Sequence, residues 1–220
     1  MTDTQSLFAL AEADDADSLL RALGERSNSA VPPVNDNGET LFLFSTYRGK
    51  SRCVESLIRR GSLTLHEAAA AGEVARITEC VASAPWSIQT LSGDGWTALH
   101  LAAFLGRDAA LRLLLDCRAD PRQWGRAFEP NLPLHAACAG RRLGRESLAS
   151  LIAATGDPDV AQKSGYTGLM IAAGNGFIDA VDALLAAGAD RTRKTTEGKM
   201  AADFACEHGH AAIADNLAAQ

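Results

Sequence analysis

The chain has no long hydrophobic run and no N-terminal targeting segment. No stretch of about eighteen consecutive apolar residues occurs, so no transmembrane helix is predicted. The first residues, Met1–Gln5, contain neither a basic region nor a long apolar core, so no secretory signal peptide is predicted. These absences favour a soluble cytoplasmic protein that makes no contact with a membrane.

The motifs of common catalytic chemistry are also absent. There is no Gly-x-Ser-x-Gly, no Gly-x-x-x-x-Gly-Lys and no His-Glu-x-x-His, since Ala70 stands where His66-Glu67 would need a second histidine. Asp14, Asp15 and Asp17 lack the spacing and the glycine of a calcium loop. We therefore predict that the protein is not an enzyme and holds no cofactor or metal ion.

Cysteines are few, and their spacing predicts no metal or redox site. The chain has five, none in a C-x-x-C motif: Cys53, Cys80, Cys117, Cys138 and Cys206. Cys138 and Cys206 fall at a repeat position that Ala103 and Ala173 fill elsewhere. Because free cysteine packs as a small hydrophobe, we expect both to be buried thiols.

Basic residues are fewer than acidic residues, and aromatic residues are few. Lys and Arg number 21 against 27 Asp and Glu, a net charge of −6. Because phosphate contacts dominate nucleic-acid affinity, this balance argues against a nucleic-acid partner. Aromatic residues make up 5% of the chain. Abundant alanine takes their place, as expected where helices pack closely.

What the chain does contain is an internal repeat. Its clearest copy, Gly95–Ala103, reads Gly-Trp-Thr-Ala-Leu-His-Leu-Ala-Ala. One small residue marks each of six copies: Ser45, Ala68, Ala102, Ala137, Ala172 and Ala205. The steps between these positions are 23, 34, 35, 35 and 33 residues. Such a period indicates stacked units, each of which buries its apolar face against its neighbours.

Further residues follow each copy in a fixed order. A helical turn, a glycine and a second apolar run come next, as at Gly106 before Leu111–Leu115, and Ala187–Asp190 reads Ala-Gly-Ala-Asp. On these residues the chain resembles the ankyrin-repeat family, from about Leu7 to Leu217. The resemblance implies an all-α solenoid of stacked helix-turn-helix units, with short β-hairpin or loop fingers between them.

Local signals in the repeat predict where its helices begin and end. Thr97 and Thr167 precede apolar runs, where a hydroxyl can accept from unpaired backbone N–H groups, and Thr64 with Glu67 forms a capping-box pattern. Gly106 suits the end of a first helix. We expect one domain over 1–220, divided as follows: an N-terminal capping repeat 1–35, repeats 36–61, 62–91, 92–124, 125–160 and 161–192, and a C-terminal capping repeat 193–220.

His66, His100 and His135 recur at matching places in successive units. Stacked helices lie about 8–10 Å apart, so these imidazoles cannot share a metal ion. The resemblance implies a structural role instead, in which each imidazole bonds to nearby backbone at the base of a finger.

Two regions depart from the repeat. The 23-residue step between Ser45 and Ala68 lacks about eleven residues, so we expect one missing finger and a notch in the finger row. Residues 107–145 hold eight Arg and no Lys against four acids. Arginine forks suit carboxylates and phosphates, so this segment predicts either contact with an acidic partner or simply a solvated face.

The family resemblance places the variable, exposed residues at the finger tips and on the concave side of the first helices. Apolar bulk at these positions is typical of an interaction site, although the same rings can instead pack on adjacent fingers. The predicted partner-binding residues are Tyr47, Arg48, Trp96, Phe104, Leu105, Trp124, Arg126, Phe128, Asn131, Tyr166 and Asn175.

Three functions use such a surface. The first is a monomeric, non-catalytic adaptor that binds a protein partner through the concave face and finger tips. The second is a dedicated regulator or inhibitor of a partner enzyme or toxin. The third and weakest is nucleic-acid binding through the arginine-rich middle. The sequence does not separate adaptor from inhibitor, because both need the same face.

Overall fold

The computed structural model describes residues 3–24, 33–61, 63–126 and 129–218. These residues form fourteen α-helices and one 3₁₀-helix. The elements are α1 (Asp3–Glu12), α2 (Ala16–Gly24), α3 (Leu41–Tyr47), α4 (Ser51–Arg60), α5 (Leu65–Ala71), α6 (Val74–Ser83), η1 (Pro85–Gln89), α7 (Ala98–Phe104), α8 (Asp108–Asp116), α9 (Pro133–Gly140), α10 (Arg145–Thr155), α11 (Gly168–Gly174), α12 (Ile178–Ala186), α13 (Ala201–Glu207) and α14 (Ala211–Ala218).

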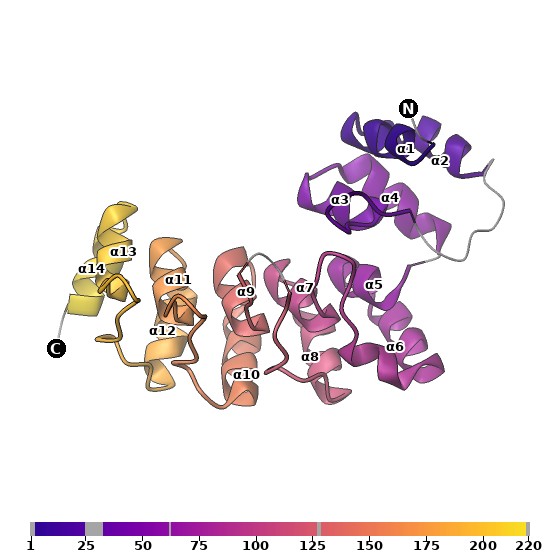
Figure 1. Cartoon of the computed structure of the whole chain (residues 1–220). Coiled ribbons are helices and arrows are strands. Elements are labelled where there is room, and N and C mark those ends of the chain that lie inside the picture. The colour runs from indigo at the N-terminus through magenta and orange to yellow at the C-terminus, as the bar shows by residue number, and fades with distance from the viewer. Residues whose placement is uncertain (1–2, 25–32, 62, 127–128, 219–220) are drawn as a thin grey trace.

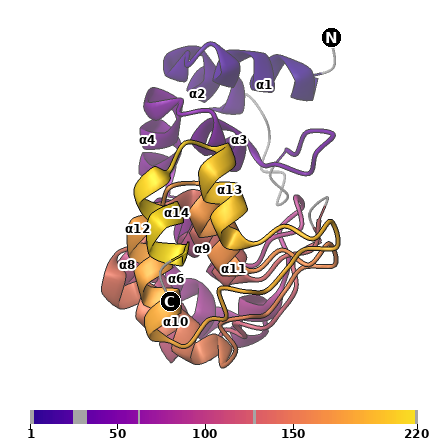
Figure 2. The ribbon, with the colours of Figure 1, turned by 90° about the vertical axis from the view of Figure 1, so that its left-hand side faces the viewer.

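Successive helices pair into hairpins, and the hairpins stack in one row (Figure 1). We call the odd-numbered helices from α3 to α13 inner helices and the even-numbered helices from α4 to α14 outer helices. The fingers are the segments that lead into inner helices, and they project to one side of the row (Figure 2). No helix in the described part of the chain is both long and apolar enough to cross a lipid bilayer.

One apolar core runs along most of the row. It extends from α3 to α14 and includes Leu99, Leu111 and Leu114, which are fully buried. A second, smaller core holds α1 to α4 together around Leu7 and Leu19. Each hairpin therefore completes its burial only against its neighbours, which confirms the predicted all-α solenoid.

Threonine caps begin four of the inner helices, as the sequence predicts for three of them. The hydroxyls of Thr40, Thr64, Thr97 and Thr167 each accept a bond from the backbone N–H three residues later, at 3.3–3.4 Å. The Glu67 carboxylate in turn accepts from the Thr64 N–H at 2.9 Å, so the capping box predicted there is confirmed.

The fingers contain less strand structure than the expected β-hairpins. In the described residues only two isolated bridges form, Val34 with Thr40 and Ala161 with Thr167. A typical finger closes with two short-range bonds, from the Ser92 N–H to the Trp96 carbonyl at 2.7 Å and from Gly95 back to Ser92 at 2.9 Å. The ladder cannot extend further because the next residue, Thr97, already caps α7.

With the N-terminal capping repeat counted as unit one, the third unit (62–91) lacks its finger, as predicted, but the expected notch is wrong. Only residues 61–64 separate α4 from α5, which leaves no room for a finger. The fingers of units two and four meet instead across the gap. Gly38 lies so close to Gly93 that a Cβ on either residue would overlap the backbone of the other.

Closing the finger row has a consequence for the shape of the molecule. From unit two to unit four the row of helices takes two steps, from α3–α4 to α5–α6 and on to α7–α8. The row of fingers takes one step, because unit three has no finger. The finger side is therefore shorter than the outer-helix side, and α1 to α4 are tilted away from the row formed by α5 to α14 (Figure 1).

The two cysteines expected at a buried repeat position differ. Cys138 is fully buried, and burial raises the pKa of its thiol to about 12. Cys206, by contrast, is exposed, so that expectation is wrong. Cys138 lies on α9 and is covered by Gly168 of α11, whereas Cys206 lies on α13, on which no further helix hairpin of the described residues stacks.

Candidate functional site

The concave surface lies between the fingers and the inner helices. Two positions in each unit line it: the residue after the finger glycine, and the second residue before the glycine that closes the inner helix. In unit four these are Trp96 and Phe104, whose rings meet edge to face with centroids 5.2 Å apart. Trp96 also lies 5.8 Å from the His100 ring. Both members of this aromatic pair are partly buried, so each keeps part of its ring on the surface.

Small residues take the place of Phe104 on the inner helices of the next two units. Unit five places Ala139 and Gly140 on the inner helix, and unit six places Gly174 there. A Cβ at Gly140 would overlap the Phe104 carbonyl, so α7 and α9 approach as closely as their backbones allow. The surface beside Phe104 therefore carries little side-chain bulk. We call this part of the concave surface, made by Ala139, Gly140 and Gly174, the low floor.

Aromatic side chains return at the far end of this floor. Tyr166 in the unit-six finger has only Gly174 opposite it, and its ring leans onto Phe204 of unit seven with centroids 5.1 Å apart. In unit seven the two positions are charged, and Lys199 pairs with Glu207 at 2.8 Å. In order along the chain, the concave surface therefore carries the aromatic pair, a stretch of small residues, the Tyr166–Phe204 contact and the Lys199–Glu207 ion pair. We call the two aromatic contacts the aromatic walls.

The finger between units four and five carries the predicted Trp124, Arg126 and Asn131. Trp124 is 41% exposed and stacks on the His135 ring with centroids 6.1 Å apart. Arg126 is exposed and lines an open polar recess of about 510 Å³ between finger tips, together with Asn37 and Asp94. Asn131 is partly buried, and its backbone carbonyl receives the bond from His100. Phe128, also predicted, lies outside the described residues.

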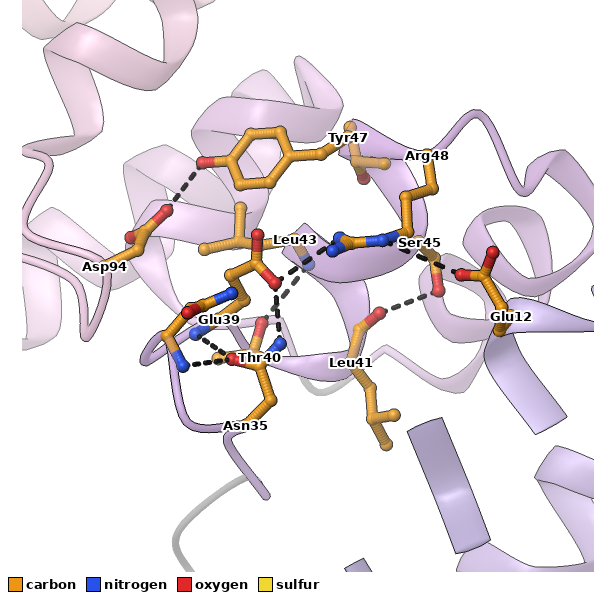
Figure 3. Close-up of polar contacts among 12 residues, drawn as sticks. Glu12, Asn35, Glu39, Thr40, Leu41, Leu43, Ser45, Tyr47, Arg48 and Asp94 are labelled. Carbon is orange, nitrogen blue, oxygen red and sulfur yellow. Dashed lines mark hydrogen bonds and ion pairs between the residues drawn. The ribbon is translucent and has the colours of Figure 1, made fainter. Parts of the chain in front are cut away.

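Tyr47 and Arg48 are engaged within the protein (Figure 3). The Tyr47 hydroxyl donates to the Asp94 carboxylate at 2.7 Å, across the gap left by the missing finger. Burial, with the charge of Asp94, raises the pKa of Tyr47 well above its ordinary value, so it remains a donor at neutral pH. The Arg48 guanidinium lies 3.4 Å from Glu39 and 3.6 Å from Glu12, and above the Phe44 ring.

Two predicted residues are less accessible than expected. Leu105 is only 6% exposed, so its placement on the exposed surface is wrong. It caps the end of α7 and joins the same core as Leu143 of the next inter-helix loop, which leaves it no free face. Asn175 is partly buried at the end of α11.

The three repeat histidines have the predicted backbone contacts. Each Nε2 donates to a carbonyl oxygen of the following segment at 2.9–3.0 Å, and the pairs are His66–Thr90, His100–Asn131 and His135–Val160. Burial lowers the pKa of all three imidazoles, that of His100 to about 4. They are therefore neutral at pH 7 and tie each unit to the next.

Sequence reasoning missed the most exposed large apolar residue of the described part. Trp86 is 73% exposed on η1, which links α6 to the finger of unit four. The signal was its position, because Pro85-Trp86 lies between repeat elements where no helix face requires a tryptophan. Ile178, at the start of α12, is also 55% exposed.

Within the described ranges no group of three or more His, Cys, Asp or Glu residues is placed to hold a metal ion. His100, which lies against Trp96, is bonded to the Asn131 carbonyl, and Tyr47 is bonded to Asp94.

Comparison with known proteins agrees with this architecture. The family model described as ankyrin repeats (3 copies) matches residues 7–124 and 134–220. A transient receptor potential cation channel subfamily A member 1 homolog of Caenorhabditis elegans is 27% identical over 214 residues, which is 96% of this chain and 17% of that protein. Human neurogenic locus notch homolog protein 4 is 42% identical over 100 residues, or 44% of this chain and 5% of that protein.

The chain therefore spans only a small part of the length of these relatives. Ankyrin repeats generally serve as protein–protein interaction modules and are typically non-catalytic. With its stacked hairpins, projecting fingers and matched repeats, the chain belongs to the ankyrin-repeat family.

Proposed function

We propose that the protein is a non-catalytic adaptor that binds a protein partner through its concave surface. The observation that carries this proposal is the partly exposed Trp96–Phe104 pair, set directly beside the low floor at Ala139 and Gly140. Aromatic side chains dominate binding hot spots because they bury large areas at a small entropic cost. A low floor between aromatic walls admits a partner's side chain without moving the repeat backbone.

Three further parts of this proposal concern the protein as a whole. We propose that residues 1–220 act as one domain, that it works as a monomer and that it does so in the cytoplasm. No channel function is proposed, because the chain matches only 17% of the channel homologue.

The test blocks the floor without removing any folded contact. Ala139 is exposed in the last turn of α9, so Ala139→Arg adds bulk and charge to the concave surface alone. The matched control is Ala154→Arg, exposed in the last turn of the outer helix α10. Both substitutions place a cation near a helix C-terminus, where it is tolerated.

We expect the unmodified chain and Ala154→Arg to capture the same proteins from native lysate, and Ala139→Arg to capture none of them. The circular dichroism spectra of all three should be the same. Retention of the same proteins by Ala139→Arg would contradict the proposal. The captured partner then separates adaptor from inhibitor. A ternary complex with a second protein supports the adaptor, whereas stoichiometric loss of the partner's activity supports a dedicated regulator.

A further inference from the structure

We propose that Arg107, Arg141 and Arg142, here called the arginine edge, bind an acidic segment of the protein partner. This inference rests on the proposed function, since the edge borders the concave surface. It also gives that partner a chemical character, which the aromatic pair alone does not.

The three arginines lie on two neighbouring loops, each joining an inner helix to its outer helix. Arg107 follows α7, and Arg141 with Arg142 follows α9. The loops touch, because a Cβ at Gly106 would overlap the backbone of Arg142. The Gly140 backbone in turn lies against the Phe104 carbonyl. A chain that covers Phe104 therefore passes next to these arginines.

The loop that carries Arg141 and Arg142 is held in place at three points. The Arg141 N–H donates to the Ala137 carbonyl at 3.2 Å, and this residue adopts a left-handed conformation with φ 59°. Leu143 is 2% exposed and anchors the loop in the core. The Gly144 N–H donates to the Asp108 carboxylate at 3.0 Å. Both arginines are exposed on this fixed loop, so little backbone entropy is lost when they bind.

Like several other cations of the described chain, the arginines of this edge form no ion pair, and their place on two touching loops sets them apart. Arg48, Lys50, Arg145 and Lys199 each lie within 4 Å of a carboxylate. In the described residues no carboxylate lies that close to any of the three arginines of the edge. Arg107 instead donates from Nε to the Ala70 carbonyl at 2.8 Å, which positions its guanidinium.

The acids nearest in the chain to the arginine edge leave its charge largely uncompensated. Asp108 follows Arg107 directly, but its carboxylate accepts the Gly144 N–H. Glu73 follows Gly72, against which the Arg107 side chain packs, and forms no ion pair in the described chain. In a protein of net charge −6, the two touching loops that carry these arginines therefore present a positive edge.

A carboxylate-bearing protein segment fits this edge better than a nucleic acid does. The guanidinium fork matches a carboxylate in a two-bond geometry. A nucleic acid needs many simultaneous phosphate contacts, whereas this edge offers only three guanidinium groups.

The experiment measures the binding of labelled synthetic peptides by fluorescence anisotropy. Three peptides of about twelve residues share one leucine and differ in being Glu-rich, Gln-rich or Lys-rich, and a single-stranded DNA oligonucleotide is the fourth probe. The test variant is Arg141→Asn with Arg142→Gln, because asparagine tolerates the left-handed backbone. The control variant, Arg122→Gln with Arg193→Gln, removes the same charge from exposed positions elsewhere.

We expect the Glu-rich peptide alone to bind, about tenfold more weakly to the test variant and unchanged to the control. Raising the salt from about 50 to about 300 mM should weaken this binding as the charges are screened. Equal losses in both variants, no binding of the Glu-rich peptide, or equal binding of the oligonucleotide would each overturn the proposal. Arg142→Gln alone repeats the test if the double variant misfolds. Failure here with loss of capture by Ala139→Arg would leave the proposed function standing without the acidic partner.

Discussion

At the residue scale, different side chains perform one task at the start of the inner helices. The third helical residue accepts a bond from the backbone N–H of the capping position. Glu67, His100, His135 and Asp203 all do so, at 2.9, 3.4, 3.0 and 2.7 Å. The task requires only an acceptor at the right distance, so carboxylate and imidazole are interchangeable there. Only the histidines also reach forward to the next unit.

Those histidines make stability depend on pH. The pKa of His100 is about 4 in the folded chain and ordinarily 6.5, so between these values the unfolded state binds more protons. The free energy of unfolding therefore falls as the pH drops through this window and is flat above it. The lowered pKa values of His66 and His135 act in the same direction.

We expect urea unfolding at pH 5 to show about 2 kcal/mol less stability than at pH 7.5 from His100 alone. At pH 5 Asp14, Asp15 and Asp190, whose pKa values are lowered by hydrogen bonds, remain ionised and contribute little. His100→Gln should remove this part of the dependence and leave the part that comes from His66 and His135. A chain equally stable at both pH values would show that the imidazoles are not held neutral.

At the scale of elements, the missing finger decides how the first two hairpins attach. Across the gap, the Thr40 hydroxyl donates to the Glu67 carboxylate at 2.7 Å and the Tyr47 hydroxyl donates to Asp94 at the same distance. Both bonds lie on the inner side of the row. The tilt of α1 to α4 is therefore fixed by the meeting of the fingers and by these two bonds to carboxylates.

Tyr47→Phe tests this attachment by removing one oxygen. A hydrogen bond to a charged group contributes about 1.5–3 kcal/mol, so we expect destabilisation of about that size in urea unfolding. The matched control is Tyr166→Phe, because the Tyr166 hydroxyl has no hydrogen bond within the described chain. Equal effects of the two substitutions would mean that the Tyr47–Asp94 bond does not hold the units together.

At the scale of the whole molecule, stability is distributed unevenly along the row. In a solenoid each unit depends on its nearest neighbours, so end units and poorly joined units open first. The units from α7 to α12 share the main core on both sides, whereas α1 and α2 lie in the smaller core at one end.

Hydrogen exchange should reveal this gradient. We expect the amides of α1 and α2 to exchange fastest, those of α3 and α4 next, and those of α7 to α12 slowest, because only the last group has a stacked neighbour on each side through the main core. Tyr47→Phe should speed exchange in α1 to α4 and leave α9 to α12 unchanged. Uniform protection along the chain would instead indicate a single cooperative unit.

The amount of structure that the sequence predicted depends on how locally each feature is specified. The period, the threonine caps, the closing glycines and the backbone contacts of the histidines all arise within one repeat or between adjacent ones. Each of these features can therefore be recognised in a window of about 35 residues. The capping box of Thr64 and Glu67 is the clearest case, because every atom involved lies within four residues.

Burial was less predictable, because it depends on which unit covers which. Leu105 and Trp96 both occupy positions expected to be exposed, yet Leu105 is enclosed by the next loop, whereas Trp96 keeps part of its surface. Cys206 repeats the sequence context of Cys138 but has no following unit over it.

By itself, the sequence determined the repeat, the helices, their ends and the order of the units, since these follow from local hydrogen bonding and apolar spacing. Only the tertiary structure decided that the finger row closes over the shortened unit and that the two loops carrying three arginines touch beside an aromatic pair. Those outcomes depend on contacts between backbones far apart in the chain, such as Gly38 with Gly93 and Gly106 with Arg142, and no local pattern encodes the distance between them.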